Sequence, residues 1–157
     1  MVNFNLFRFA LVASCAALSC AAASADTLSM TVQASVTGTC KLSSVPLLDF
    51  GALNQVTAPI VLTSGTVTYR CTKGTAPTAF TLGGLAANPF AGVLTNTANT
   101  DNFAYSIAWV APTAPGNGLG ATSTAINVVL NGTIAASVYQ NVSAGTYNQV
   151  VAILIAP

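Results

Sequence analysis

Side chains able to perform acid–base, nucleophilic or metal chemistry are scarce in this chain. Its 157 residues include no histidine and only three acidic residues, which are Asp26, Asp49 and Asp101. Two carboxylates held together can act as an acid–base pair, but no feature of the sequence brings Asp49 and Asp101 together. We therefore expect no catalytic site, no bound cofactor and no metal site.

Cysteine is the remaining reactive side chain, and the chain has four. Cys15 and Cys20 fall within a predicted leader, which leaves Cys40 and Cys71 in the mature chain. An exported pair of cysteines without histidine favours a structural disulfide over a metal site. A redox pair is the alternative, although the spacing is far longer than C-x-x-C. Closing a loop of about thirty residues would stabilise the fold by about 3–4 kcal/mol.

The first 25 residues have the pattern of a cleaved secretory signal peptide. Arg8 is their only charge, an apolar run follows it, and Ala23-Ser24-Ala25 forms an A-x-A cleavage site. The alternatives are a transmembrane anchor and a lipoprotein signal ending at Cys15. Cleavage would start the mature chain at Asp26.

Charge is almost absent from the mature chain. Its basic residues are Lys41, Arg70 and Lys73, which the three aspartates balance to a net charge of zero. Only 4% of all residues are charged, against about a quarter in a typical soluble domain. The sequence therefore lacks a basic surface for nucleic acid, and so uncharged a surface favours association with other protein.

The mature chain has the pattern of a β-sandwich. No segment shows a helical period, and Gly, Pro, Asn or Thr interrupts the chain about every eight to twelve residues. The expected strands cover residues 39–45, 47–53, 66–71, 78–82, 103–110, 125–130, 133–138 and 146–155, with a short strand near Val93. In residues 103–110 one face carries Phe103, Tyr105, Ile107 and Trp109. That face predicts a buried core, with sugar stacking as the alternative.

Two features define how the sheet turns and ends. Asn131-Gly132 predicts a tight hairpin because both residues tolerate positive φ. Near the C-terminus, residues 150–155 form a continuous apolar run, which predicts a strand covered on both faces. A terminal strand without charge or proline is an unprotected sheet edge. We therefore expect a missing neighbouring strand and an open groove beside it.

The start of the mature chain is a strand-like stretch, residues 27–36, called here the N-terminal stretch. Its apolar positions alternate with polar ones and are Leu28, Met30, Val32, Ala34 and Val36. This period of two predicts a strand with one buried face. Such a strand can complete a sheet of a neighbouring copy, or it can pair within its own chain through a turn at Gly38.

An ordered set of short motifs carries a family resemblance. It begins with Thr39-Cys40-Lys41-Leu42 and Leu48-Asp49-Phe50-Gly51, and continues with Tyr69-Arg70-Cys71-Thr72-Lys73-Gly74. Tyr105-Ser106-Ile107 and Ser143-Ala144-Gly145-Thr146-Tyr147-Asn148 follow. In that order they resemble the spore coat protein U domain family, which includes subunits of archaic, Csu-type chaperone–usher pili.

This resemblance implies an all-β, incomplete immunoglobulin-like sandwich that lacks its last strand. Residues 26–38 would be a donor-strand extension and residues 39–157 the pilin domain. Leu28, Met30, Val32, Ala34 and Val36 would enter a neighbour's groove, whose lining would include Val151, Ile153 and Ile155. The family pattern commonly has an acidic residue and a terminal aromatic strand where this chain has Asn148 and Ile-Ala-Pro.

Two functions follow as expectations. The first is a structural subunit of a surface pilus that supports adhesion and biofilm formation. Its partners would be other pilus subunits, a periplasmic chaperone and an outer-membrane usher, with no nucleic acid and no small-molecule substrate. The second is a secreted or lipid-anchored β-sandwich that binds a ligand such as a glycan. The second would need a complete sheet and a charged surface for solubility.

Overall fold

The structure is a computed structural model that describes residues 26–157, of which residues 35–157 belong to one compact unit. The predicted signal peptide lies outside the described residues. Across residues 26–157 the chain forms eight β-strands and no helix, which confirms the predicted all-β class. The strands are β1 (Cys40–Ser44), β2 (Val61–Cys71), β3 (Ala79–Leu82), β4 (Phe90–Asn96), β5 (Asn102–Trp109), β6 (Ile126–Ile134), β7 (Tyr147–Asn148) and β8 (Ile153–Ala156).

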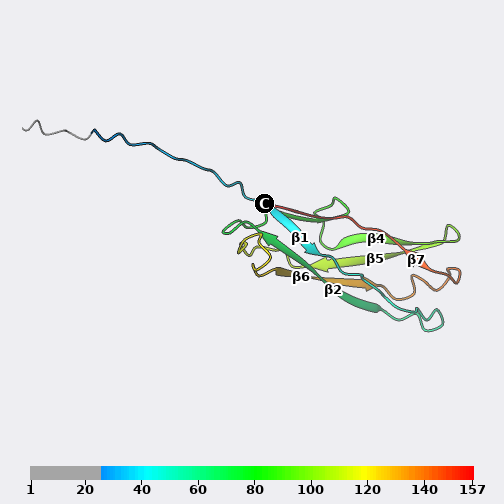
Figure 1. The fold of residues 1–157 in the computed structure, drawn as a ribbon. Helices are drawn as coiled ribbons and strands as arrows, with labels where there is room; N and C mark the ends of the chain where they lie inside the picture. The colour runs from blue at the N-terminus through cyan, green and yellow to red at the C-terminus, as the bar shows by residue number, and fades with distance from the viewer. Residues whose placement is uncertain (1–25) are drawn as a thin grey trace, which may run out of the picture. The chain divides into compact units, whose positions relative to one another are not determined.

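The strands form one large and one small sheet. The large sheet has the order β1-β2-β6-β5-β4-β7, and β3 pairs with β8 in the small one. All the pairings between these strands are antiparallel. Figure 1 shows β2, β6, β5 and β4 side by side, with the C-terminus close to the beginning of β1. The two sheets together are consistent with a β-sandwich.

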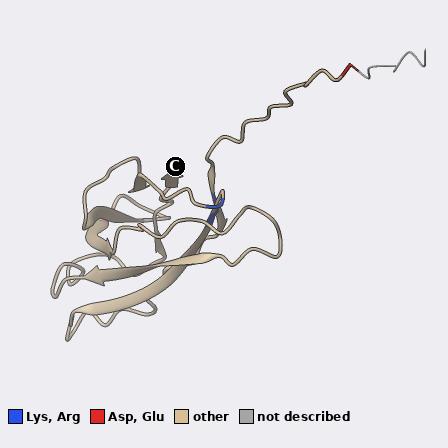
Figure 2. Cartoon of the chain, turned by 90° about the vertical axis from the view of Figure 1, so that its left-hand side faces the viewer, with Lys and Arg blue, Asp and Glu red and all other residues tan. Residues whose placement is uncertain are grey.

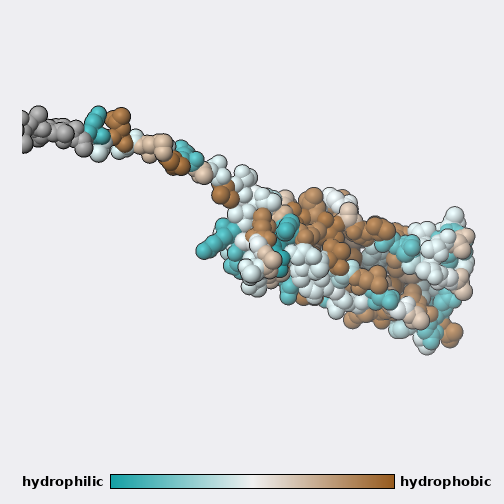
Figure 3. Space-filling view, in the orientation of Figure 1, coloured by the Kyte–Doolittle hydropathy of each residue, from teal (hydrophilic) through white to brown (hydrophobic). Residues whose placement is uncertain are grey.

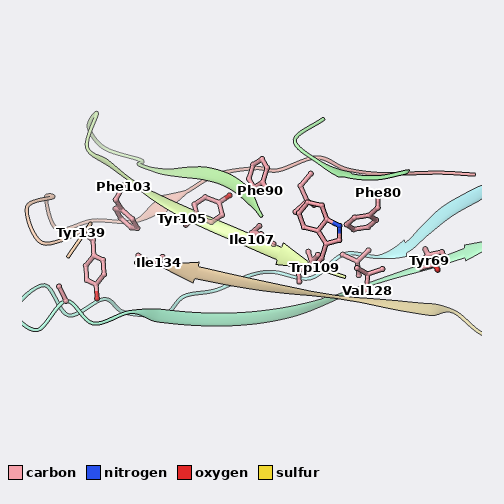
Figure 4. Packing of buried hydrophobic residues seen from close by; sticks show 14 of the residues in the cluster. Tyr69, Phe80, Phe90, Phe103, Tyr105, Ile107, Trp109, Val128, Ile134 and Tyr139 are labelled. Atoms are coloured by element: carbon pink, nitrogen blue, oxygen red, sulfur yellow. The ribbon is translucent and has the colours of Figure 1, made fainter. Parts of the chain in front are cut away.

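Alternation along β5 builds the centre of the core. Phe103, Tyr105, Ile107 and Trp109 are each at most 7% exposed, while the residues between them face outward or lie at the margin. Figure 4 shows these side chains packed with others from both sheets, including Phe80 from β3 beside Trp109. The ring centroids of Phe80 and Trp109 are 5.8 Å apart. The predicted core face is confirmed.

The disulfide lies at one end of the large sheet. Cys40 is directly opposite Cys71 in the β1–β2 register, and the two side chains are bonded. Cys71 is fully buried, as are Val67 and Tyr69 on the same face of β2. The disulfide therefore ties β1 to the C-terminal end of β2, the longest strand.

The hairpin predicted at Asn131-Gly132 is wrong. Strand β6 continues through both residues, with Gly132 opposite Thr63 of β2 and opposite Ile107 of β5. Because β6 is paired on both sides, its neighbours satisfy the backbone and no turn forms. The glycine serves packing instead, since a Cβ there would come within 2.9 Å of the Phe50 ring.

Two expected strands also differ from the structure. Residues 47–53 form no strand, and the expected strand over residues 146–155 is divided into β7 and β8. Strand β7 pairs with β4 of the large sheet, whereas β8 pairs with β3 of the small one. Because the chain changes sheets between them, one face of the apolar run points outward: Val150 is 97% and Leu154 is 54% exposed. The prediction that both faces are covered is wrong.

Candidate functional site

A groove opens over the core of the domain between two segments of the chain. One flank is residues 46–53, which follow β1, and the other is residues 142–153, which lead into β8. The groove consists of a large hollow of about 510 Å³ and a small hollow of about 160 Å³. Leu48, Phe50 and Leu94 line both hollows, so they adjoin one another.

Core side chains form the floor of this groove. Phe103, Ile134 and Tyr139 lie under the large hollow, and Leu82, Tyr105, Ile107 and Leu130 lie under the small one. Burial raises the pKa of the Tyr105 hydroxyl, because the ionised form would lose its hydration. In the view of Figure 3, hydrophobic surface gathers along the middle of the domain. Such a floor suits an apolar ligand or an apolar row of side chains.

Two glycines allow the first flank to cross closely above the sheet. A Cβ at Gly65 of β2 would come within 2.6 Å of Pro46, and one at Gly132 would meet the Phe50 ring. Gly51 itself has a φ of 69°, and its N–H donates to Oδ1 of Asp49 at 2.8 Å. The flank is thus fixed by side-chain packing and a local turn rather than by pairing with a strand.

The second flank is held at its ends. Asn148 of β7 pairs with Thr95 of β4, and Ile153 of β8 pairs with Leu82 of β3. Between these pairs the Gly83 N–H donates to the carbonyl of Ala152 at 2.8 Å. Within residues 26–157, β8 hydrogen-bonds to no strand other than β3. One edge of β8 therefore has no hydrogen-bonded strand among these residues.

A small polar network fixes the rim of the large hollow. Oδ2 of Asp101 accepts hydrogen bonds from the N–H of Ser143 at 2.7 Å and from its hydroxyl. The Tyr147 hydroxyl donates to the carbonyl of Ser143 at 2.7 Å, and the Asn99 amide donates to its Oγ. The two bonds from Ser143 lower the pKa of the Asp101 carboxyl. Because these groups bond one another and hold the loop around Ser143, the network has a structural rather than a catalytic character.

A family model matches this chain over residues 26–154 and is described as the spore coat protein U domain. The match covers both flanks, the core beneath them and the N-terminal stretch. The chain belongs to the spore coat protein U domain family. Domains of this family are associated with chaperone–usher pilus subunits and are not known as enzymes. No curated protein matches the chain in a sequence comparison.

In this member of the family, two of the three side chains expected in the groove line it. Val151 and Ile153 both border the small hollow. Ile155 lines neither hollow and is partly buried against the core, where it pairs with Phe80. The groove thus ends before Ile155, close to where β8 passes beside β3.

The expected donor residues lie in a segment without secondary structure. Residues 26–39 form no strand, and Leu28, Met30, Val32 and Val36 are all more than 80% exposed. Ala34 is exposed as well. Burying side chains of this kind against another apolar surface would be favourable.

The sequence reasoning missed the first flank and most of the floor. Leu48 and Phe50 line both hollows, yet they belong to a segment expected to be an ordinary strand. The short apolar pattern Leu48-Asp49-Phe50 was visible, and so were the two glycines that let it approach the sheet. Nothing in the sequence shows which strands those glycines face, so the flank could not be placed.

Metal-ligand clusters and membrane-spanning helices are both absent from residues 26–157. Among residues 26–157, no three side chains of His, Cys, Asp or Glu gather as metal ligands would. In the same residues, no helix is long and apolar enough to cross a membrane.

Proposed function

We propose that this protein is a structural subunit of a surface pilus, assembled by donor-strand exchange and supporting adhesion and biofilm formation. In this proposal the N-terminal stretch of one subunit lies in the groove of the next. A periplasmic chaperone occupies the groove first, and an outer-membrane usher directs the exchange. The proposal includes removal of residues 1–25 as a signal peptide and export to the cell surface.

One observation carries the proposal: an apolar groove lies over the core beside a β8 edge that bonds no second strand in residues 26–157. An extended strand supplies both missing things, because its backbone bonds sheet edges while alternate side chains point to one face. The same chain carries such an alternating stretch, exposed and unpaired within the described residues.

Dimensions and energies agree with this fit. Nine residues from Leu28 to Val36 span about 30 Å when extended, a length comparable to the eleven residues of β2. Burying Leu28, Met30, Val32 and Val36 would contribute about 6–12 kcal/mol before the cost of ordering the strand. Hydrogen bonds to the groove edges would add to that contribution.

A specific deletion tests the proposal. Without residues 27–36, the mature protein co-expressed with a pilus chaperone should form a soluble one-to-one complex, because the domain itself is intact. Once released from the chaperone, the variant should accept a donor strand in its groove but has no strand to donate. Electron microscopy should therefore show no fibres from this variant alone. A synthetic peptide covering residues 27–36 should bind the variant and raise its melting temperature.

The full-length mature chain is the matched control and should form fibres under the same conditions. A deletion variant that cannot fold even with the chaperone would show that the stretch belongs to its own sandwich. Fibres that grow from the deletion variant would equally overturn the proposal.

A further inference from the structure

The few charges of the domain are separated into two groups at opposite ends. Lys41 of β1 lies directly opposite Arg70 of β2, next to the Cys40–Cys71 pair, and Lys73 follows two residues later. Figure 2 shows the lysine and arginine residues gathered at one place in the domain. These three residues are called here the cationic end.

Asp49 and Asp101 lie toward the other end, called here the acidic end. Asp49 lines the large hollow together with Ser143, and Ser143 donates two hydrogen bonds to Asp101. The large hollow also touches Ile134, which pairs with Val61 at the start of β2. Since β2 runs eleven residues from Val61 to Cys71, about 30 Å of strand separates the two ends.

Holding the cations together has a cost within the subunit. Like charges directly opposite one another across two strands repel, and Lys41 and Arg70 occupy that position. With only six charged residues after residue 25, no other strong field masks the two ends. The arrangement weakens the isolated domain slightly, so its benefit is expected in contact with another molecule.

The chain path determines which ends meet when one subunit donates to another. The N-terminal stretch joins the domain at Cys40, so Val36 is five residues from Lys41 of the cationic end and about 18 Å away at most. Wherever Val36 sits in the neighbour's groove, the donor's cationic end must therefore lie nearby.

The groove offers two directions, which differ in charge. From β7 to β8 the second flank runs from the acidic end toward the cationic end, where Thr78 bonds the carbonyl of the last residue, Pro157. A stretch antiparallel to β8 places Val36 at the neighbour's acidic end, and opposite charges meet. A parallel stretch brings two cationic ends together.

Resting on the proposed donor-strand exchange, we infer that the cationic end of each subunit docks on the acidic end of the next copy. Lys41 and Lys73 face Asp49 and Asp101 across this contact, which steers incoming subunits and selects one direction of insertion. Opposite charges across an interface act mainly on the rate of encounter and on the rejection of wrong pairings.

Charge reversal on the full mature chain tests this contact. Four proteins are compared by the growth rate of fibres from chaperone complexes: the wild type, Lys41→Glu/Lys73→Glu, Asp49→Lys, and the combination of all three changes. Lys41→Glu/Lys73→Glu should slow growth about tenfold at low salt, because every junction then joins two ends of net negative charge. Asp49→Lys should slow growth by a smaller factor, because its acidic end then carries no net charge to attract the cationic end. The combined variant should recover to within about threefold of the wild type, since the lysine introduced at position 49 then lies opposite the glutamates introduced at positions 41 and 73. Salt near 1 M should shrink these differences.

A control places two negative charges between the ends. Ser64 and Thr66 are exposed in the middle of β2, so Ser64→Glu/Thr66→Glu should grow within about twofold of the wild type. Equal growth of all four proteins would overturn the contact while leaving donor-strand exchange intact. A combined variant as slow as the slower single reversal would also overturn it. Failure of the wild type to form fibres would instead count against the proposed function.

Discussion

Two stretches of this chain share one sequence pattern and differ in their structure. In the N-terminal stretch apolar residues alternate with polar ones, and in β5 large apolar residues alternate with small or polar ones. In β5 the four large apolar residues are at most 7% exposed, whereas Leu28, Met30, Val32 and Val36 are at least 81% exposed. Alternation therefore indicates that a segment is able to form a strand, while a sheet edge within reach decides whether it does.

The difference lies in the neighbours that each stretch finds. Strand β5 bonds β4 on one side and β6 on the other, so its backbone is satisfied and its apolar face is covered. Residues 26–39 form no strand with any part of the described chain. The domain meanwhile keeps a groove above its core, which the proposed donor strand would fill.

The largest difference between the two stretches is expected when an aspartate replaces a residue of the apolar face of each. Ile107→Asp should prevent folding even with a chaperone, because an unpaired carboxylate in the core costs several kcal/mol, about as much as a domain has to spare. Val32→Asp should fold normally with the chaperone but should reduce fibre yield at least tenfold. Soluble complex on gel filtration and fibre yield by electron microscopy measure the two outcomes.

Matched outward positions provide the controls for this pair. Thr31→Asp and Ser106→Asp each place the same charge on the polar face of the same stretch, and both should leave fibres within about twofold of the wild type. If Val32→Asp and Thr31→Asp behave alike, the N-terminal stretch does not insert with one face buried.

The fold could be predicted from the sequence where the pattern and the partner coincide. The alternation of Phe103 to Trp109 predicted β5 and its core, and the isolated Cys40 and Cys71 predicted the bond that the structure contains. Local propensity misled where tertiary pairing overrode it, since Asn131-Gly132 lies inside β6 between two ladders.

The groove could be predicted only in part. The family resemblance implied an acceptor groove lined by Val151, Ile153 and Ile155, and the first two border the small hollow. Leu48 and Phe50 were not expected, because their position depends on space left by Gly65 and Gly132 on other strands. Contacts of this kind join residues far apart in sequence, and no local pattern reports them.

The Cys40–Cys71 bond anchors β1, the strand that follows the N-terminal stretch. Strand β1 bonds only β2 within residues 26–157, and the Cys40–Cys71 bond closes a loop with a sequence separation of 31. The double variant Cys40→Ser/Cys71→Ser should lose about 3–4 kcal/mol of stability. Urea unfolding of the subunit filled with the peptide of residues 27–36 measures this loss.

Chemical reduction of the wild type provides the control and should give a similar loss without any substitution. A loss below about 1 kcal/mol would show that the ladder of β1 and β2 holds this end without the bond. A loss of about 3–4 kcal/mol would show that the disulfide is needed to keep the domain, and with it the groove, folded.

The smallest effect on stability is expected at Asp101, on the rim of the large hollow. The hydrogen bonds from Ser143 favour the ionised carboxylate and lower the pKa of Asp101 in the folded state below its usual value of 3.8. The stabilising contribution is therefore fully present above that value and is lost as the pH falls through the folded-state pKa. Because the carboxylate is solvent-exposed and screened, the effect should be slight.

Urea midpoints of the peptide-filled subunit at about pH 5 and about pH 2.5 should differ less for Asp101→Asn than for the wild type. Asn99→Ala removes an uncharged bond to the same serine, so it should shift both midpoints equally. An acid loss in Asp101→Asn as large as in the wild type would show that this carboxylate does not hold the rim.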